Sequence, residues 1–479
     1  MSLPTIIQGG MGVAVSNWRL ARAVSQLGQL GVVSGTMAGV VLARRLQLGD
    51  AGGHMRRALE HFPIPAIAER VIRHFFVEGG KAPEAPFRAV PMPGVHPAAA
   101  WTEINVAGAF TEVFLARQGH ANPVGINVLE KVQVATLASL FGAMLAGVGY
   151  VIMGAGIPRW IPGVLDQFAV GSPAELKVDM PAGPQPEAIS RLDPAEFFAG
   201  YGPAPQLERP KFLAIVSSAT LALTLARKSN GRVDGFVVES ELAGGHNAPP
   251  RGPMQLSATG EPIYGPRDVP DLAKIGEIGL PFWLAGSRAD PEGLAEARRL
   301  GAVGIQVGTA FAFCEESGID PQIKRAVHQL SREGRAHVKT DPLASPTGFP
   351  FKVLGMEGTL SEDGVYAERK RVCDLGYLRQ TYAKPDGSLG YRCAAEPDDA
   401  FVQKGGDPAE LAGRKCLCNG LLATVGLAQM RPDGEAELPI ITAGDEVARV
   451  ARLVPPGADG YTARDVIRHL LGAEAENVA

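Results

Sequence analysis

The chain has 479 residues, enough for about three ordinary domains or for one large barrel that carries insertions. Its 46 Lys and Arg residues nearly balance its 50 Asp and Glu residues, and neither sign forms a long run. Because nucleic acids are bound through clustered cations, we expect no nucleic-acid partner.

The first residues, MSLPTIIQ, lack the basic segment and the apolar core of a signal peptide. We therefore expect a cytoplasmic location. Five cysteines in a chain of this length do not form a secreted disulfide framework, and an odd number prevents complete pairing within the chain.

Eight short apolar runs, rich in β-branched residues, predict parallel strands that are covered on both faces. They span residues 4–8, 30–35, 123–129, 150–156, 211–218, 234–240, 281–287 and 303–309. Helical patterns fit between them. Ser217 or Ser218 is expected to cap one helix, and Asp290 followed by Pro291 begins another, which Gly301 ends.

Eight such units favour an α/β fold of the (β/α)8 TIM-barrel type. A doubly wound sheet is the alternative, although it would usually show five or six strands and one glycine-rich turn near the start. The predicted barrel covers residues 1–39 and 123–316, and residues 40–122 form a helical insertion after the second strand. Residues 171–210 read as a surface excursion, and residues 317–479 as a C-terminal extension or cap.

Residues 132–158 contain no charge and are long enough to cross a membrane. Their apolar residues recur at intervals of three and four up to Gly147 and Gly149, which is typical of an amphipathic helix. The following YVIMGAG reads as a strand. We therefore expect a helix and then a strand, with no membrane partner.

The turns after the seventh and eighth strands contain AGSRADPEG and GIQVGTAF. In barrels these two turns form the usual phosphate site, because glycines let backbone N–H groups approach an anion. The alternative is that the glycines serve only tight turns. After the sixth strand, Gly244 and Gly245 precede His246, which we take as the catalytic candidate because an imidazole exchanges protons near neutral pH.

Two further positions could contact a cofactor. The first loop, from Gln8 to Gly12, could lie flat against a planar ring, because its glycines carry no side chains. Asn127, at the end of the third strand, could hydrogen-bond a cofactor or a phosphate oxygen, or only cap a turn. In the extension, residues 340–351 (TDPLASPTGFPF) predict an ordered loop near the mouth, as part of a lid.

Six segments occur along the chain in the order IIQGGMG, VGINV, MGAG, ELAGGHN, LAGSRAD and GIQVGTAF. With these segments in this order, the chain resembles the nitronate monooxygenase family, also called 2-nitropropane dioxygenases. That family is related to flavin-dependent enoyl-acyl carrier protein reductases. The resemblance implies a flavoprotein with FMN, whose ring lies near Gly9, Gly10 and Met11 and beneath His246. It implies that the FMN phosphate is held by Gly286, Ser287, Gly308 and Thr309. The chain departs from the family in having Ser287 and Asn247 where glycines are usual.

The implied activity is the oxidation of an alkyl nitronate by O2 to a carbonyl compound and nitrite. One alternative is an NAD(P)H-dependent reductase of an enoyl thioester or a quinone. A second is a non-catalytic FMN-binding subunit of a larger synthase. In each case the ligand is a small molecule, and self-association is left open.

Four cysteines, Cys373, Cys393, Cys416 and Cys418, lie in the extension. Clustered thiols are natural ligands of zinc and of iron–sulfur clusters. Because the paired C-x-x-C spacing is missing, buried thiols explain these cysteines better, and we predict no metal.

Overall fold

The computed structural model describes residues 3–181 and 187–472, and within them the eight predicted strands form one parallel sheet. The strands are β1 (Ile6–Gln8), β2 (Gly31–Ser34), β3 (Val124–Leu129), β4 (Tyr150–Gly154), β7 (Lys211–Val216), β8 (Gly235–Glu239), β9 (Phe282–Ala285) and β10 (Gly304–Val307). Their order is β1-β10-β9-β8-β7-β4-β3-β2, and a parallel bridge between Ile7 and Leu30 joins the two ends. The predicted (β/α)8 barrel is therefore confirmed.

Side chains that alternate along the strands fill the barrel interior, as the pleat requires. This inner cluster consists of Ile7, Leu30, Val32, Tyr150, Ile152, Leu213, Val237, Trp283 and Ala285. The indole N–H of Trp283 donates to the carbonyl oxygen of Pro4 at 2.8 Å, so the largest inner side chain has no unpaired polar atom. The other strand residues pack outward under the helices.

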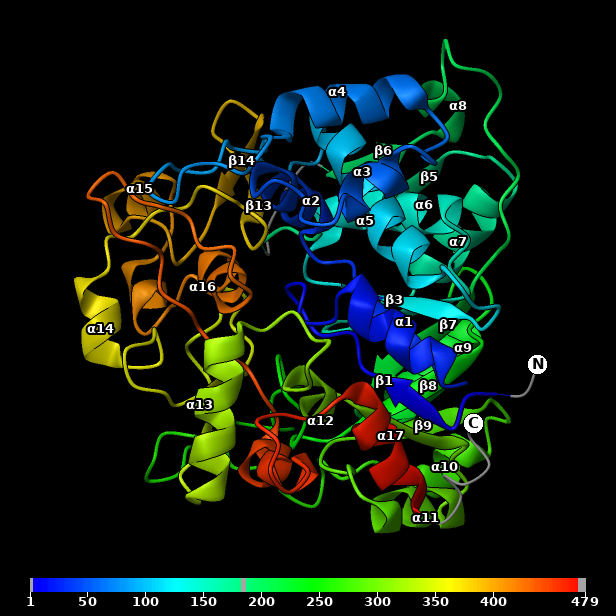
Figure 1. Cartoon of the computed structure of the whole chain (residues 1–479), viewed down its shortest axis with the longest axis vertical. Coiled ribbons are helices and arrows are strands. Elements are labelled where there is room, and N and C mark those ends of the chain that lie inside the picture. Colours follow the sequence, from blue (N-terminus) through cyan, green and yellow to red (C-terminus); the bar gives the residue numbers. More distant parts are fainter. Residues whose placement is uncertain (1–2, 182–186, 473–479) are drawn as a thin grey trace.

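Helices surround the barrel (Figure 1). They are α1 (Trp18–Gln26), α6 (Gln133–Leu145), α7 (Ile161–Ala169), α9 (Ala219–Lys228), α10 (Leu272–Gly276), α11 (Pro291–Arg299) and α12 (Thr309–Ala312). The side chain of Ser218 caps α9, and that of Asp290 caps α11, which begins with Pro291. Both predicted helix starts are therefore confirmed.

The segment between β2 and β3 contains α2 (Ala38–Gln47), α3 (His54–Leu59), α4 (Pro65–Phe75) and α5 (Ala99–Ala116). Helix α5 packs against both α2 and α6. A Cβ at Gly142 of α6 would lie 2.1 Å from the carbonyl oxygen of Val106, so only glycine allows this close approach. Consequently α6 is not the amphipathic helix expected from its periodicity, because every residue from Ala135 to Met144 is buried.

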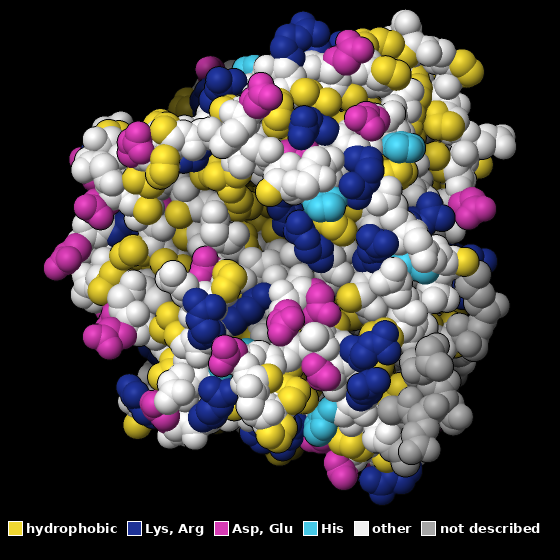
Figure 2. All heavy atoms as spheres, in the orientation of Figure 1, with side chains coloured by type: hydrophobic (Ala, Val, Ile, Leu, Met, Phe, Trp, Pro, Cys, Tyr) yellow, Lys and Arg dark blue, Asp and Glu magenta, His cyan; other side chains and the backbone are white. Residues whose placement is uncertain are grey.

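No helix in the described ranges is both long and apolar enough to cross a membrane. On the face shown in Figure 2, cationic and anionic side chains are interspersed. The predicted surface excursion contains a hairpin, β5 (Ala174–Lys177) and β6 (Ile189–Leu192), followed by α8 (Pro194–Phe197). No pattern in the sequence indicated this hairpin.

The extension is present and packs beside the barrel (Figure 1). Its elements are α13 (Pro321–Arg332), β11 (Val338–Asp341), β12 (Phe351–Leu354), α14 (Asp363–Glu368), β13 (Gln380–Ala383), β14 (Leu389–Arg392), α15 (Asp398–Gln403), α16 (Leu417–Thr424) and α17 (Ala463–Leu471), with 3-10 helices at Pro408–Leu411 and Asp445–Leu453. Helix α17 returns to pack on α1 and α11. The domain boundaries at residues 40, 123 and 317 stay a prediction.

Candidate active site

The carboxyl ends of the barrel strands open into one cavity. Every site residue predicted from the sequence lines it, namely Gly9, Gly10, Met11, Asn127, Gly244, Gly245, His246, Gly286, Ser287, Gly308 and Thr309. They come from the turns after β1, β8, β9 and β10 and, for Asn127, from strand β3 itself. The structure thus brings together residues as far apart in sequence as Gly9 and Thr309.

The turns after β9 and β10 present unpaired polar groups to this cavity. Gly286 and Ser287 both have left-handed backbones, with φ values of 97° and 48°. Among the described residues, no acceptor is found for the backbone N–H groups of Gly286, Ser287, Gly308 or Thr309. The Oγ atom of Ser287 is also buried without a partner. Because buried donors are costly when unpaired, these groups mark a place for an anionic ligand.

The hydroxyl of Thr309 is already engaged. Its Oγ1 accepts a hydrogen bond from the backbone N–H of Gly444, in the extension, at 2.9 Å. Because a hydroxyl that accepts one hydrogen bond can still donate another, both the O–H and the backbone N–H of Thr309 are left for a ligand.

The first loop is fixed from below by Ser16, whose Oγ donates to the carbonyl oxygen of Gly9 and accepts from the N–H of Met11, both at 2.9 Å. A Cβ at Gly10 would lie 2.2 Å from the Cβ of Asn127. Glycine is therefore required at position 10 by packing against Asn127, a role that the sequence did not reveal.

The loop that carries His246 is held by the extension. The backbone N–H of Lys352 donates to the carbonyl oxygen of Gly245 at 2.9 Å, and the N–H of Gly245 donates to Oγ1 of Thr442 at 3.0 Å. His246 itself bridges to Phe351, and the centroids of their two rings are 4.9 Å apart. The orientation of the imidazole is thus set by residues about one hundred or more positions away.

His246 is electrically neutral at physiological pH. Burial, together with the smaller effect of the nearby charge of Lys131, lowers the pKa of its imidazole to about 3. Its Nε2 lies 2.7 Å from the Oγ of Ser345. A neutral imidazole in this position can donate one hydrogen bond and accept one.

Glu239 is a cavity residue that the sequence patterns did not single out. It ends β8, and burial raises the pKa of its carboxyl to about 8, so the group is mainly protonated at neutral pH. A charged residue at the carboxyl end of a barrel strand was the available signal. The extension adds further lining residues, which have no βα pattern to predict them: Phe351, Leu421, Thr442, Ala443 and Glu446.

The predicted loop over residues 340–351 lies at the mouth, where Phe351 lines the cavity. In the same extension, Cys373, Cys393 and Cys416 pack against Ala395, and all four extension cysteines are free thiols. Within residues 3–181 and 187–472, no group of three or more His, Cys, Asp or Glu side chains could hold a metal ion.

A family model described as nitronate monooxygenase matches residues 206–341. A nitronate monooxygenase of Paraburkholderia phytofirmans is 31% identical over 183 residues, which are 37% of this chain and 47% of that protein. A probable nitronate monooxygenase of Staphylococcus haemolyticus is 32% identical over 124 residues, which are 26% of this chain and 33% of that protein. The chain thus matches half or less of the length of these relatives.

Solved structures similar to the whole chain include FabK from Thermotoga maritima, with 16% identity and a TM-score of 0.47, covering 99% of this chain and 94% of that one. Another is a nitroalkane oxidase from Streptomyces ansochromogenes, with 16% identity and a TM-score of 0.46, covering 99% of this chain and 97% of that one. At these values the two likenesses carry no argument about function.

Proposed function

We propose that this chain is an FMN-dependent oxidoreductase. Its resemblance to the nitronate monooxygenase family is confirmed by the match over residues 206–341. Its substrate is a small alkyl nitronate, which it converts with O2 to a carbonyl compound and nitrite. The observation that carries the proposal is that two turns with unpaired backbone N–H groups and a neutral histidine face one cavity. We also propose a cytoplasmic location, because five cysteines in a chain of this length do not form a secreted disulfide framework.

The residues present fit FMN. Its phosphate would be held by the backbone N–H groups of Gly286, Ser287, Gly308 and Thr309, together with the unpaired Oγ of Ser287. A second orphaned atom, the buried Oε1 of Gln306, also belongs to a residue of this cavity and would accept a hydrogen bond from the cofactor.

The ring would lie near Gly9, Gly10 and Met11, with Asn127, Gly244 and Gly245 at its edges. A Cβ at Gly245 would meet nothing within 4 Å, so the backbone there leaves open space for a ligand. When bound, FMN would supply the electron acceptor for the substrate and the means of passing electrons to O2.

The protein side chains suit a substrate that is already an anion. A nitronate has lost its proton, so it needs a hydrogen-bond donor more than a strong base. The neutral imidazole of His246 supplies such a donor, and the protonated carboxyl of Glu239 adds no repelling charge. Apolar side chains on the cavity wall exclude water and accommodate a short alkyl group: Val13, Val15, Leu129, Leu242, Phe351 and Leu421.

The purified protein should be yellow or should bind added FMN, and anaerobic titration with propane-2-nitronate should bleach the flavin absorbance. His246→Gln should retain FMN but lower kcat/KM for the nitronate by about 100-fold or more, the usual range for a positioned catalytic side chain. The matched control His96→Gln, at an exposed site in the insertion, should behave as the wild type.

Other outcomes would contradict the proposal. Bleaching by NADH or NADPH and not by the nitronate would indicate the enoyl-thioester or quinone reductase. Bleaching by neither would indicate a non-catalytic FMN-binding subunit. A colourless protein that does not bind FMN would refute the flavin site itself.

A further inference from the structure

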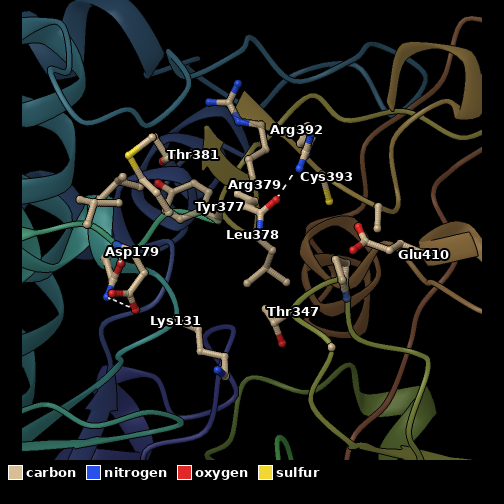
Figure 3. Close-up of a pocket in the computed structure, with 18 of the residues that line it drawn as sticks. Lys131, Asp179, Thr347, Tyr377, Leu378, Arg379, Thr381, Arg392, Cys393 and Glu410 are labelled. Atoms are coloured by element: carbon tan, nitrogen blue, oxygen red, sulfur yellow. Dashed lines mark hydrogen bonds between the residues drawn. The ribbon is translucent and has the colours of Figure 1, made fainter. Parts of the chain in front are cut away.

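A second cavity lies between the barrel mouth and the extension (Figure 3). Its wall is polar and charged and includes the solvent-exposed residues Asp179, Gly348 and Gln380, so it is continuous with water. Figure 3 shows Lys131 and Thr347 at its lower edge and Arg379 and Arg392 at its upper edge. The proposed reaction alone assigns no role to this space.

The segment from Ser345 to Phe351 is the partition between the two cavities. Phe351 lines the candidate active site, whereas Pro346, Thr347 and Gly348 line the second cavity. The partition is anchored by Arg414, whose guanidinium donates to the carbonyl oxygen of Ser345 at 2.6 Å. The two spaces are therefore separated by a fixed strip of chain.

One hydrogen-bonded chain crosses this partition. Nε2 of His246 lies 2.7 Å from Oγ of Ser345, and that oxygen lies 2.8 Å from Oγ1 of Thr347. Ser345 is fully buried, with 0% of its surface exposed, so no water competes for its hydroxyl. Both contacts are short enough for proton transfer between neighbouring groups.

We propose that Ser345 and Thr347 form a hydroxyl relay through which His246 exchanges protons with the water of the second cavity. The two residues act through His246 and are therefore positioning residues of the site. This inference rests on the proposed function for its use in catalysis, although the relay itself requires neither flavin nor substrate.

The transfer conserves protons and moves no electrons. When His246 gives the proton on one ring nitrogen to a bound anion, Nε2 takes a proton from Ser345, Ser345 takes one from Thr347, and Thr347 takes one from a water of the second cavity, which is left as hydroxide. The reverse sequence removes a proton from the site. In both directions the imidazole ends neutral in its other tautomer, and both hydroxyls are restored once they rotate.

The surroundings of His246 explain why a relay is needed. Burial of the imidazole and the nearby charge of Lys131 disfavour the protonated, cationic form of His246. The ring therefore cannot hold an extra proton between steps. A concerted exchange, in which one nitrogen gains a proton as the other loses it, avoids the cationic state.

The test follows the ring N–H proton of His246 in protein labelled with ¹⁵N-histidine and free of flavin, with the signal assigned from His246→Gln. We expect the exchange of this proton with water to slow about tenfold or more in Ser345→Ala and in the isosteric Thr347→Val. Thr347→Ser, which keeps the hydroxyl, should restore the exchange to within about twofold of the wild type.

The same variants are then compared with FMN and propane-2-nitronate. Thr347→Val should bind FMN normally and show a larger solvent isotope effect on kcat than the wild type, and Thr347→Ser should not. Unchanged proton exchange in both Ser345→Ala and Thr347→Val would overturn the relay. An inactive wild type with slowed exchange in the variants would instead contradict the proposed function and leave the relay standing.

Discussion

A negative charge at position 287 should abolish tight FMN binding. Ser287 has φ of 48° and its Oγ is buried and unpaired beside the N–H groups that would hold the phosphate. Ser287→Asp places a carboxylate there, and Ser287→Asn places a neutral group of the same shape. Both Asp and Asn tolerate the left-handed backbone, so the pair isolates the effect of charge.

The expected magnitude follows from Coulomb's law. Two like unit charges about 4–6 Å apart, at an effective dielectric constant of about 20, repel by about 3–4 kcal/mol. Side-chain rotation and salt reduce this to about 2–4 kcal/mol, so the Kd for FMN should rise about 30-fold to 700-fold. Ser287→Asn should stay within about threefold of the wild type, because the side-chain amide of Asn can donate a hydrogen bond to the phosphate in place of the hydroxyl.

The assay is the quenching of FMN fluorescence on titration with apoprotein, at low and high salt. Circular dichroism and the urea midpoint show whether both variants are folded. Equal weakening by Asp and Asn, or no weakening by Asp in a folded protein, would refute the placement of the phosphate at the turns after β9 and β10.

Two predictions concern stability. Glu239→Gln should raise the urea midpoint of the flavin-free protein more at pH 8 than at pH 5. Burial raises the pKa of this carboxyl in the folded protein to about 8, from its usual 4.5. The stabilising contribution of the protonated carboxyl is therefore complete below pH 4.5 and is lost as the pH rises toward 8, by at most about 1.4 kcal/mol per pH unit. An equal effect of the substitution at both pH values would contradict the burial of this carboxyl. Gly142→Ala should destabilise the protein by about 1–3 kcal/mol in urea unfolding, because the added Cβ would lie 2.1 Å from the carbonyl oxygen of Val106. The control Gly276→Ala should be nearly neutral, because nothing lies within 4 Å of the added Cβ there. Similar effects of the two substitutions would show that α5 and α6 are not in close contact.

The barrel could be predicted from the sequence because each of its strands is buried on both faces. Such strands are continuous apolar runs, and each is followed by a turn that must face the same end of the barrel. Residues as distant as Gly9, His246 and Gly308 could therefore be assigned to one site from the order of strands and turns alone. All three line the same cavity.

The hairpins could not be predicted in the same way. β13 and β14 contain polar residues such as Gln380 and Arg392, which interrupt any continuous apolar run, and both strands are largely exposed or half-buried. The predicted helix α6 and the strand after it are confirmed, but the expected polar face of the helix was wrong. Its apolar stripe was real, but its other face, with small residues such as Ala138 and Gly142, is covered by α5. A periodic pattern shows one buried face and says nothing about a second.

The contacts of the extension with the site were also beyond local patterns, since they join residues far apart in sequence. A Cβ at Gly244 would lie 2.7 Å from the backbone nitrogen of Gly444, which itself donates to Thr309. Thr442 meanwhile accepts from Gly245. The segment from Thr442 to Gly444 therefore touches both the histidine loop and the turn after β10, and it closes one side of the cavity.

This arrangement bears on where substrate choice is made. The family match ends at residue 341, and Phe351, Leu421, Thr442 and Glu446 all lie beyond it. The phosphate turns and His246 come from the matched part, so the resemblance bears mainly on how a cofactor is held. Part of the wall that a substrate would touch, including Phe351 and Leu421, therefore comes from the extension, which the match over residues 206–341 does not cover. Substitution of these two residues would test whether the extension contributes to substrate choice.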